Sequence, residues 1–469
     1  MQKNDNVGER LNFTTLLGLS APALPLAALT LPLTTFVPEY YTHALGMQLS
    51  VVGLIFMIVR LLDIGLDPLL GGWMDRTRSR WGRFRPWMFI GMPMVMGGSA
   101  LLFFAQPGVG PLYLLAALLL TYAGYSVVTL AQLALSSAMT TSYQNRAKVF
   151  TWWQVVTTLG IILVLILPPA LNVRTEHMVP VMGWSIVITA PICVLLCLFL
   201  VKDRHQPLER PHAGLRAYFR MLRRPSAFKV IISHWMIGMA GGVTAACGIF
   251  FLTAVKKITL ADFAQMTLVL FIAGVLSAPL WSALAQRIGK HNGFMLAAAC
   301  QLVFLASTYF LPVGQVMPIL VAAVLGGLGY SGGSLLPPAM LADVADEEEL
   351  ETGIDRTGLL FALMTGIFKI GQAVSVGLVF GLLDLIGFDP KLGSANSAGS
   401  LNAVALIYSF ASAAFALAAI VIIAGYRLTA ARSAEVRAAL DAQRAAARAT
   451  ASSDHRGIEA DAVRAEFHP

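Results

Sequence analysis

The chain contains 469 residues, of which 57 % are hydrophobic and only 12 % carry charged side chains. Soluble globular domains contain about 25 % charged residues, so a chain this apolar must cover much of its surface with lipid. The formal net charge of +8 is also found in proteins that bind nucleic acid. Basic residues gather in the cytoplasmic loops of membrane proteins, however, and we expect a lipid bilayer as the partner and no nucleic acid.

Twelve apolar segments follow one another along the chain, and each approaches or exceeds the roughly 20 residues that a helix needs to cross a bilayer. We expect spans at 14–41, 49–72, 86–105, 111–138, 148–171, 179–201, 228–254, 262–286, 293–312, 316–341, 357–387 and 400–427. The first segment is too long for a signal-peptide core, so we expect it to remain as the first span. The sequence therefore predicts an all-α polytopic membrane protein.

The distribution of lysine and arginine predicts the orientation of these spans. Of the 33 basic residues, the alternate loops that we assign to the outside hold only Arg174, Lys256, Lys257 and Lys391. We therefore expect a multi-pass protein of the bacterial inner membrane with both termini on the cytoplasmic side. The predicted domains are a six-helix bundle at 1–201, a cytoplasmic linker at 202–227, a second six-helix bundle at 228–427 and a cytoplasmic tail at 428–469.

A weak internal repeat relates the two groups of six spans. Pro68 and Arg76, after the second span, match Pro279 and Arg287, after the eighth, at one constant offset. Parallel repeats of six spans are typical of the major facilitator architecture, so we expect the major facilitator fold.

Four charged residues lie deep inside the predicted spans, away from the ends. Arg60, Asp63 and Asp67 are spaced i, i+3 and i+7 on one face of the second span, and Lys369 lies within the eleventh. A charge at the bilayer centre costs about 2.5–3.5 kcal/mol even on the lenient insertion scale, so these side chains must face the protein interior. One interpretation is a proton or cation site on Asp63 and Asp67, for which Lys369 competes when the ion is absent. The alternative is a static ion-pair cluster that joins the second and eleventh spans.

A second set of charges is expected on the cytoplasmic side. The acidic residues follow the tenth span, and the facing arginines come from the first half of the chain. Pairing between the two sets would close the cytoplasmic face, whereas the alternative is a solvated charge run in which each pair contributes little. The predicted gate comprises Asp75, Arg76, Arg83, Arg146, Asp343, Asp346 and Glu349.

Three motifs resemble the glycoside–pentoside–hexuronide:cation symporter family, of which the melibiose permease is typical. They are RLLDIGLDPLLG at 60–71 with RWGRFRPW at 80–87, MLADVADE at 340–347, and more loosely MTTSYQNR at 139–146. The resemblance implies cation-coupled symport by alternating access. It also implies that the carboxylates in the first motif bind the coupling cation, with a lysine nearby and the solute at the midplane. We assign Ser126 and Thr129 to the same cation site.

The solute site departs from that family. The positions that carry two acids and an arginine in the melibiose-permease type are Ala27, Thr129 and Gln154 here, whereas a threonine of the eleventh span is retained as Thr365. With Trp153 and Ser334 added, these residues form the predicted solute site. This lining suits a less polar glycoside or related sugar, and the alternative is an amphipathic solute of the kind carried by the distantly related lysolipid symporters.

The coupling ion is predicted to be a proton, with sodium as the alternative. Leu66 precedes the second aspartate where the family often has Asn or Thr, so one oxygen ligand for sodium is missing. Two buried carboxylates beside a basic group can instead exchange a proton.

Other functions were weighed against symport. A membrane-embedded enzyme is disfavoured because we find no H-E-x-x-H, P-loop or convincing nucleophile elbow. A solute sensor and an antiporter remain open alternatives. We expect no cofactor, no metal other than a possible sodium ion, and a monomer.

Overall fold

The structure is a computed structural model of the full chain, and it describes residues 12–139, 143–174, 177–201, 222–353, 356–426, 428, 432–436, 438–440 and 442–443. Within these residues it is all helical, and twelve helical segments are long and apolar enough to span a membrane. The predicted span count is therefore confirmed.

The N-terminal half contains the first six spans. The first is a broken helix built from α1 (Phe13–Ser20), α2 (Ala23–Leu31), η1 (Pro32–Phe36), α3 (Val37–Glu39) and η2 (Tyr40–Ala44). The others are α4 (Leu49–Arg76), α5 (Arg85–Phe103), α6 (Pro111–Met139), α7 (Tyr143–Ala170) and α8 (Met178–Leu200). The breaks in the first span coincide with its prolines, which remove backbone donors and bend the helix.

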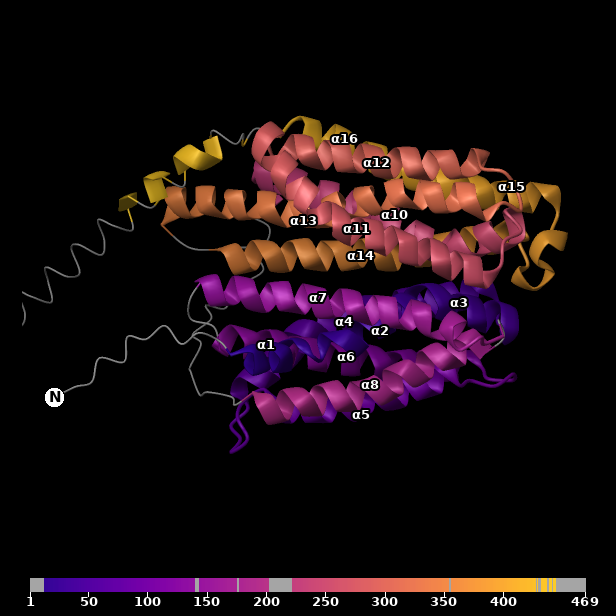
Figure 1. The fold of residues 1–469 in the computed structure, drawn as a ribbon, viewed down its shortest axis with the longest axis horizontal. Helices are drawn as coiled ribbons and strands as arrows, with labels where there is room; N and C mark the ends of the chain where they lie inside the picture. The colour runs from indigo at the N-terminus through magenta and orange to yellow at the C-terminus, as the bar shows by residue number, and fades with distance from the viewer. Residues whose placement is uncertain are drawn as a thin grey trace, which may run out of the picture.

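The C-terminal half contains the other six spans. They are α10 with η4 (Pro225–Phe250 and Phe251–Val255), α11 (Leu260–Ile288), α12 (Lys290–Phe310), α13 (Val316–Thr352) and α14 (Thr357–Leu385). The last span combines α15 (Ala398–Leu406), η6 (Ile407–Ala411) and α16 (Ser412–Ala424), preceded by η5 (Pro390–Ala395). Figure 1 shows the two halves side by side with their helices roughly parallel to the long axis.

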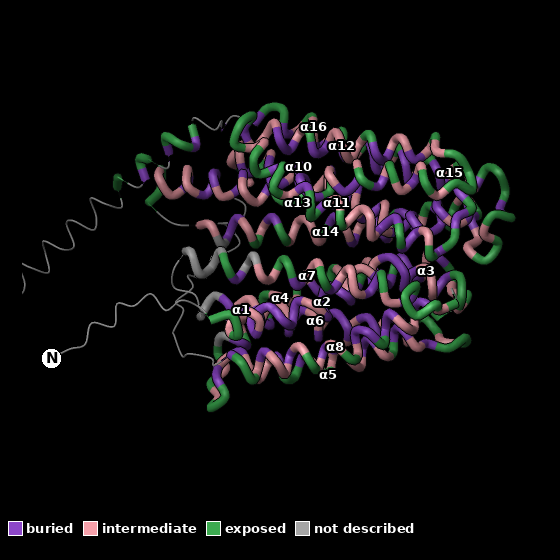
Figure 2. Tube along the Cα trace, viewed as in Figure 1, coloured by how far each residue is buried: buried purple, intermediate pink, exposed green. Residues whose placement is uncertain are grey.

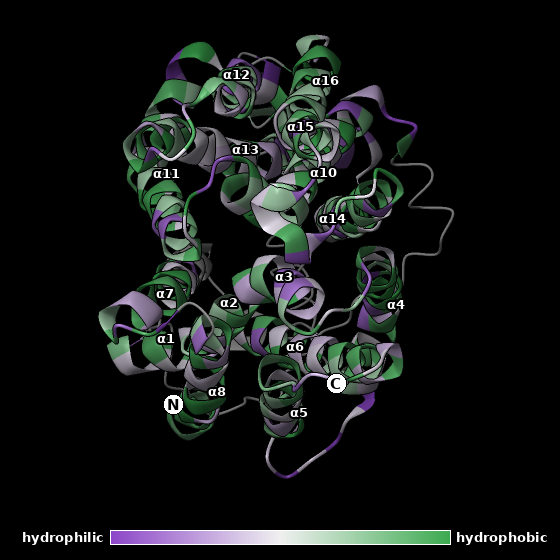
Figure 3. Ribbon diagram, turned by 90° about the vertical axis from the view of Figure 1, so that its right-hand side faces the viewer, coloured by the Kyte–Doolittle hydropathy of each residue, from purple (hydrophilic) through white to green (hydrophobic). Residues whose placement is uncertain are grey.

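The repeat inferred from two prolines and two arginines is visible in the helices themselves. The π-helical turn η2 and the start of α4 at Leu49 correspond to η4 and the start of α11 at Leu260, at the same offset that relates Pro68 to Pro279. The first and seventh spans are also the most buried, at 78 % and 67 %, whereas the span on α11 is only 17 % buried. Each half therefore places its first helix toward the interior of the molecule, where Figure 2 shows buried segments. The view along the helices in Figure 3 shows α2 and α3 near the middle of the bundle.

The two halves share one apolar core at the end of the molecule where α3 lies. The ring of Phe36 in η1 packs edge to face against the ring of Phe263 in α11, with 5.6 Å between the ring centroids. Both residues belong to a buried cluster that runs through the two halves. A second buried cluster, which includes Trp281 and Met340, is confined to the C-terminal half. Apolar packing therefore joins the halves most continuously at the α3 end.

Several boundaries differ from the prediction by a few residues, and the end of the tenth span differs most. The tenth span was expected to end at 341, but α13 continues to Thr352 and ends at Gly353, whose φ of 70° is left-handed. The acidic residues from Asp343 to Glu351 are therefore helical, because neither glycine nor proline lies between Pro338 and Gly353. The predicted linker at 202–227 lies mostly outside the described residues, and its last residues already belong to α10, which starts at Pro225.

Candidate functional site

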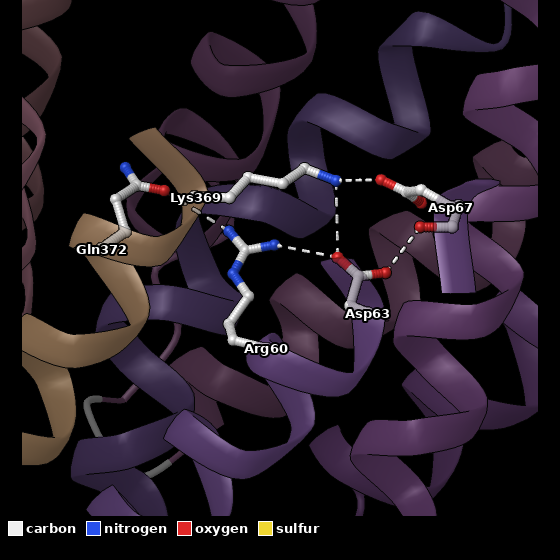
Figure 4. A network of polar contacts seen from close by, with 6 residues as sticks. Arg60, Asp63, Asp67, Lys369 and Gln372 are labelled. Carbon is white, nitrogen blue, oxygen red and sulfur yellow. Dashed lines mark hydrogen bonds and ion pairs between the residues drawn. The ribbon is translucent and has the colours of Figure 1, made fainter. Parts of the chain in front are cut away.

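The four intramembrane charges meet where α4 of the first half packs against α14 of the second. Lys369 Nζ lies 2.6 Å from Asp67 Oδ2 and 3.5 Å from Asp63 Oδ2, and Arg60 Nη1 lies 3.8 Å from Asp63 Oδ2 (Figure 4). The carboxylate of Asp63 is only 1 % exposed, and the side chains of Arg60 and Lys369 are 12 % and 22 % exposed. The structure thus brings together two acids and two bases from both halves in a nearly buried network.

A third helix completes the surroundings of Asp63. Ser126 of α6 donates a hydrogen bond of 2.6 Å from its hydroxyl to Asp63 Oδ1. Three buried oxygens of the predicted cation site have no hydrogen-bond donor among the described residues: Asp63 Oδ2, which is ion-paired only, Asp67 Oδ1 and Thr129 Oγ1. Buried polar atoms without a hydrogen-bond partner are uncommon, and each costs about 1–3 kcal/mol of desolvation. Such oxygens are suited to accept a proton or to contact a small cation.

Sequence analysis missed two residues that hold Arg60. The guanidinium lies over the ring of Tyr122 at 4.8 Å, and its Nη2 donates a long hydrogen bond of 3.5 Å to Gln372 Oε1 on α14. Gln372 follows Lys369 by one helical turn, and this spacing is the only sequence signal that could have identified it. Tyr122 precedes Ser126 by one turn on α6, so the same rule would have placed it beside the predicted site.

The network belongs to a continuous seam between α4 and α14. A side chain added at Gly53 would meet Phe380 Cβ at 2.5 Å, and one added at Gly377 would meet Met57 Sδ at 2.7 Å. These glycines let the two helices approach closely, as small residues do in membrane bundles. The seam runs from these apolar contacts to the Arg60–Gln372 contact and then to the carboxylates, so the charges occupy one end of a tightly packed helix pair.

The predicted solute residues do not all occupy open positions. Ala27 is buried, and its Cβ lies 3.1 Å from the position that a Cβ on Gly160 of α7 would take, so it belongs to the packing between the first and fifth spans. Gln154, Ser334 and Thr365 are exposed, and Trp153 and Thr129 are half-buried. Ala27 is therefore unsuited to contact a solute directly in this conformation, because its methyl group faces α7.

The predicted gate residues are only partly described. Asp343 pairs with Lys290 of its own half at 2.6 Å, and Arg83 donates to the Met74 carbonyl at 3.3 Å, again within one half. Arg76 is exposed. The side chains of Asp75 and Arg146 lie outside the described residues, and Asp346 and Glu349 are half-buried and engaged in further interactions. Closure between the halves by these residues stays a prediction.

Comparison with known proteins identifies the family. The profile of the MFS/sugar transport protein family matches residues 18–430. The glucuronide carrier protein homologue of Escherichia coli is 28 % identical over 75 % of this chain and 79 % of its own length, and the isoprimeverose transporter of Lactiplantibacillus pentosus is 27 % identical over 80 % of each chain.

Solved structures agree on the fold. The nucleoside transporter NupG (D323A mutant) superposes with a TM-score of 0.62 at 15 % identity, covering 88 % of this chain and all of the other. A bacterial homologue of the human lysosomal transporter Spinster, in an inward-facing unoccupied conformation, gives a TM-score of 0.60 at 13 % identity over 91 % and 96 % of the two chains. The chain therefore belongs to the MFS/sugar transport family of multi-pass membrane transporters and is a relative of the glycoside/cation symporters.

Proposed function

We propose that the chain is a cation-coupled symporter that carries a small hydroxyl-bearing solute, a glycoside or related sugar, by alternating access. One observation carries this proposal: Lys369 of the second half holds both carboxylates of the first half, Asp63 and Asp67. A tethered ammonium in contact with one buried and one half-buried acid occupies the position that a coupling cation would need. Relatives named as a glucuronide carrier homologue, an isoprimeverose transporter and a glycoside/cation symporter support the solute class.

Charge balance explains how the network would couple two events. With Arg60 and Lys369 charged and both acids ionised, the formal charge of the four side chains is zero. Two like charges about 4 Å apart repel by roughly 4 kcal/mol at an effective dielectric constant of 20. A cation entering beside Lys369 therefore favours a state in which the ammonium leaves the acids. Because Lys369 lies on the other half, this departure would change how the halves pack.

The proposed coupling ion is a proton, with sodium as the alternative. Sodium requires several oxygen ligands, and Leu66 contributes none at the position before Asp67. A carboxyl group that accepts a proton releases its hold on Lys369 without any further ligand. The hydroxyls of Ser126 and Thr129 would complete a sodium site only if both turned toward the same ion.

A second candidate is transport of an amphipathic solute. It is favoured by the predicted solute positions, where Ala27 is packed against α7 and Trp153 is half-buried, so this side supplies few charged partners for sugar hydroxyls. Antiport would use the same carboxylates. We further propose that both termini are cytoplasmic, that the chain functions as a monomer, and that the acidic end of α13 pairs with the arginines after α4 in the outward-open state.

Thermal stability of the purified chain tests the proposal. A ligand that binds the native state at 100 times its Kd stabilises it by about 2.7 kcal/mol. We expect stabilisation by members of a nitrophenyl glycoside panel, enhanced at low pH and little changed by sodium. Lysolipids that stabilise the protein while glycosides have no effect would favour the second candidate. If Asp63→Asn keeps cation-driven accumulation of the solute in proteoliposomes, the cation-site assignment is wrong.

A further inference from the structure

Arg60 is the charge with the weakest contacts in the network. A guanidinium has five N–H donors. Among the described residues, Arg60 makes a 3.8 Å ion pair with Asp63, a 3.5 Å hydrogen bond to Gln372 and a ring contact with Tyr122. Its side chain is only 12 % exposed, so water satisfies few of the remaining donors. Small shifts of its two polar partners therefore decide how strongly Arg60 holds Asp63.

The oxygen and the nitrogen of the Gln372 side-chain amide point in different directions. Arginine is only a donor, so the amide oxygen Oε1 must be the atom that faces Arg60. The amide nitrogen Nε2 is then directed away from the charges, as Figure 4 shows. No described residue accepts a hydrogen bond from this nitrogen, and the residue is only half-buried. One end of the amide is thus engaged with the cation network and the other end is available.

The position of Gln372 relates it to both halves. It lies one turn from Lys369 on α14, so the same helix face presents an ammonium to the carboxylates and an amide to Arg60. Both contacts cross from the C-terminal to the N-terminal half. A ligand that fixes the Gln372 amide therefore acts on the second base of the network without contacting either acid.

We propose that Gln372 transmits solute binding to the cation site: its Nε2 donates to an oxygen of the solute, while its Oε1 sets the position of Arg60 beside Asp63. This inference rests on the proposed symport of a hydroxyl-bearing solute. Gln372 is a solute contact through one atom and a positioning residue for the carboxylates through the other. The solute class that it recognises is one with hydroxyl, glycosidic or ring oxygens.

The expected consequence is reciprocal coupling. Hydrogen bonds in a chain polarise one another, so donation to a solute oxygen strengthens acceptance from Arg60 at the other end of the amide. When Gln372 binds Arg60 more strongly, Arg60 binds Asp63 less strongly. The Asp63 carboxylate then becomes a better ligand for a proton or cation. By linkage, the cation then raises solute affinity by the same factor, typically 5–150-fold in coupled systems.

A matched pair of substitutions tests this role in the full-length purified chain. Gln372→Met keeps the side-chain length and removes both hydrogen-bonding ends. Gln301→Met makes the same change on α12, where the Gln301 amide lies against Gly329 of the same half. The affinity of the most strongly stabilising nitrophenyl glycoside is measured with and without saturating cation, using low pH and sodium in separate series.

We expect wild type and Gln301→Met to bind the glycoside about 10-fold more tightly with the cation, and Gln372→Met to show less than about a 2-fold enhancement. The cation affinity of Gln372→Met without solute should be weaker than that of wild type, because Arg60 loses its contact with Gln372 and is then held more strongly by Asp63. An enhancement that survives in Gln372→Met overturns the inference and leaves symport standing. If the wild type responds to neither glycoside nor cation, the proposed function fails and this inference fails with it.

Gln372→Glu separates the two ends of the amide. It keeps an oxygen for Arg60, replaces the N–H donor with an acceptor and adds a negative charge beside Arg60, so the glycoside measured without cation should bind about 10-fold more weakly. Wild-type glycoside affinity in Gln372→Glu would show that Nε2 does not contact the solute.

Discussion

Lys369→Met is the most direct test of the charge network. The substitution keeps the length of the side chain and removes an ammonium that lies 2.6 Å from Asp67 and 3.5 Å from Asp63. At an effective dielectric constant of 20 the two gross attractions are roughly 6 and 5 kcal/mol, and desolvation offsets much of this. Breaking a buried pair by removing one partner costs about 3–5 kcal/mol, so the cation-free variant should be markedly less stable than wild type.

The same substitution should strengthen cation binding. A cation that enters wild type must displace Lys369, whereas the variant offers the two carboxylates without a competitor. If about 1.4–2.8 kcal/mol of the displaced interaction opposes cation binding, its removal tightens cation affinity by 10–100-fold. Solute accumulation should nevertheless fail, because the variant has no ammonium on α14 whose contact with the carboxylates depends on whether the cation is bound.

Thermal unfolding of the variant against cation concentration, at two pH values, measures both effects. Lys391→Met, which removes a positive charge from the exposed η5 segment, is the matched control and should titrate like wild type. A folded Lys369→Met protein with unchanged or weaker cation affinity would refute the idea of a tethered competitor. It would leave Lys369 as a static link between α4 and α14.

Three further substitutions probe other parts of the site. Ser126→Ala removes a charge-assisted hydrogen bond that stabilises the ionised Asp63 carboxylate by about 1.5–3 kcal/mol, so it should strengthen proton binding by roughly 10-fold or more and weaken sodium binding in the same titration. Gly53→Val adds atoms where a Cβ already meets Phe380 at 2.5 Å, so cross-linking between cysteines placed along α4 and α14 should slow or fail. Arg83→Glu should increase labelling of the solute site from the cytoplasmic side, since it replaces attraction with repulsion toward the acidic end of α13. Unchanged labelling would mean that the gate does not use this arginine.

Hydropathy was sufficient to locate the membrane helices because each span needs a long apolar run. The tenth span shows the limit of that signal. The apolar run ends near 341, but α13 continues to Thr352 because its acidic residues are compatible with helix, and the left-handed Gly353 ends it. Hydropathy reports where a segment leaves the bilayer, and the helix itself can extend beyond that point.

The network could be anticipated in part because charges are costly in a span and must find one another. That rule indicated Arg60, Asp63 and Lys369, which the structure brings together. The rule did not indicate Tyr122 or Gln372, because an uncharged residue in a span carries no large free-energy cost that would mark it as functional. The position of Ala27 against α7 was equally hidden, because a match to a family position says nothing about which face of the helix is packed.

The asymmetry between the halves has a packing explanation. The repeat relates Asp63 on α4 to Gly274 on α11. At Gly274 an added Cβ would lie 3.3 Å from the Gly327 carbonyl of α13, so the backbones of α11 and α13 approach too closely there for a carboxylate. At Asp63 the equivalent helix, α6, instead offers the hydroxyl of Ser126. Close glycine packing in one half thus occupies the space that a buried acid takes in the other. If Asp63 binds the coupling ion as we propose, the repeat supplies such a residue on α4 and none at the equivalent position of α11.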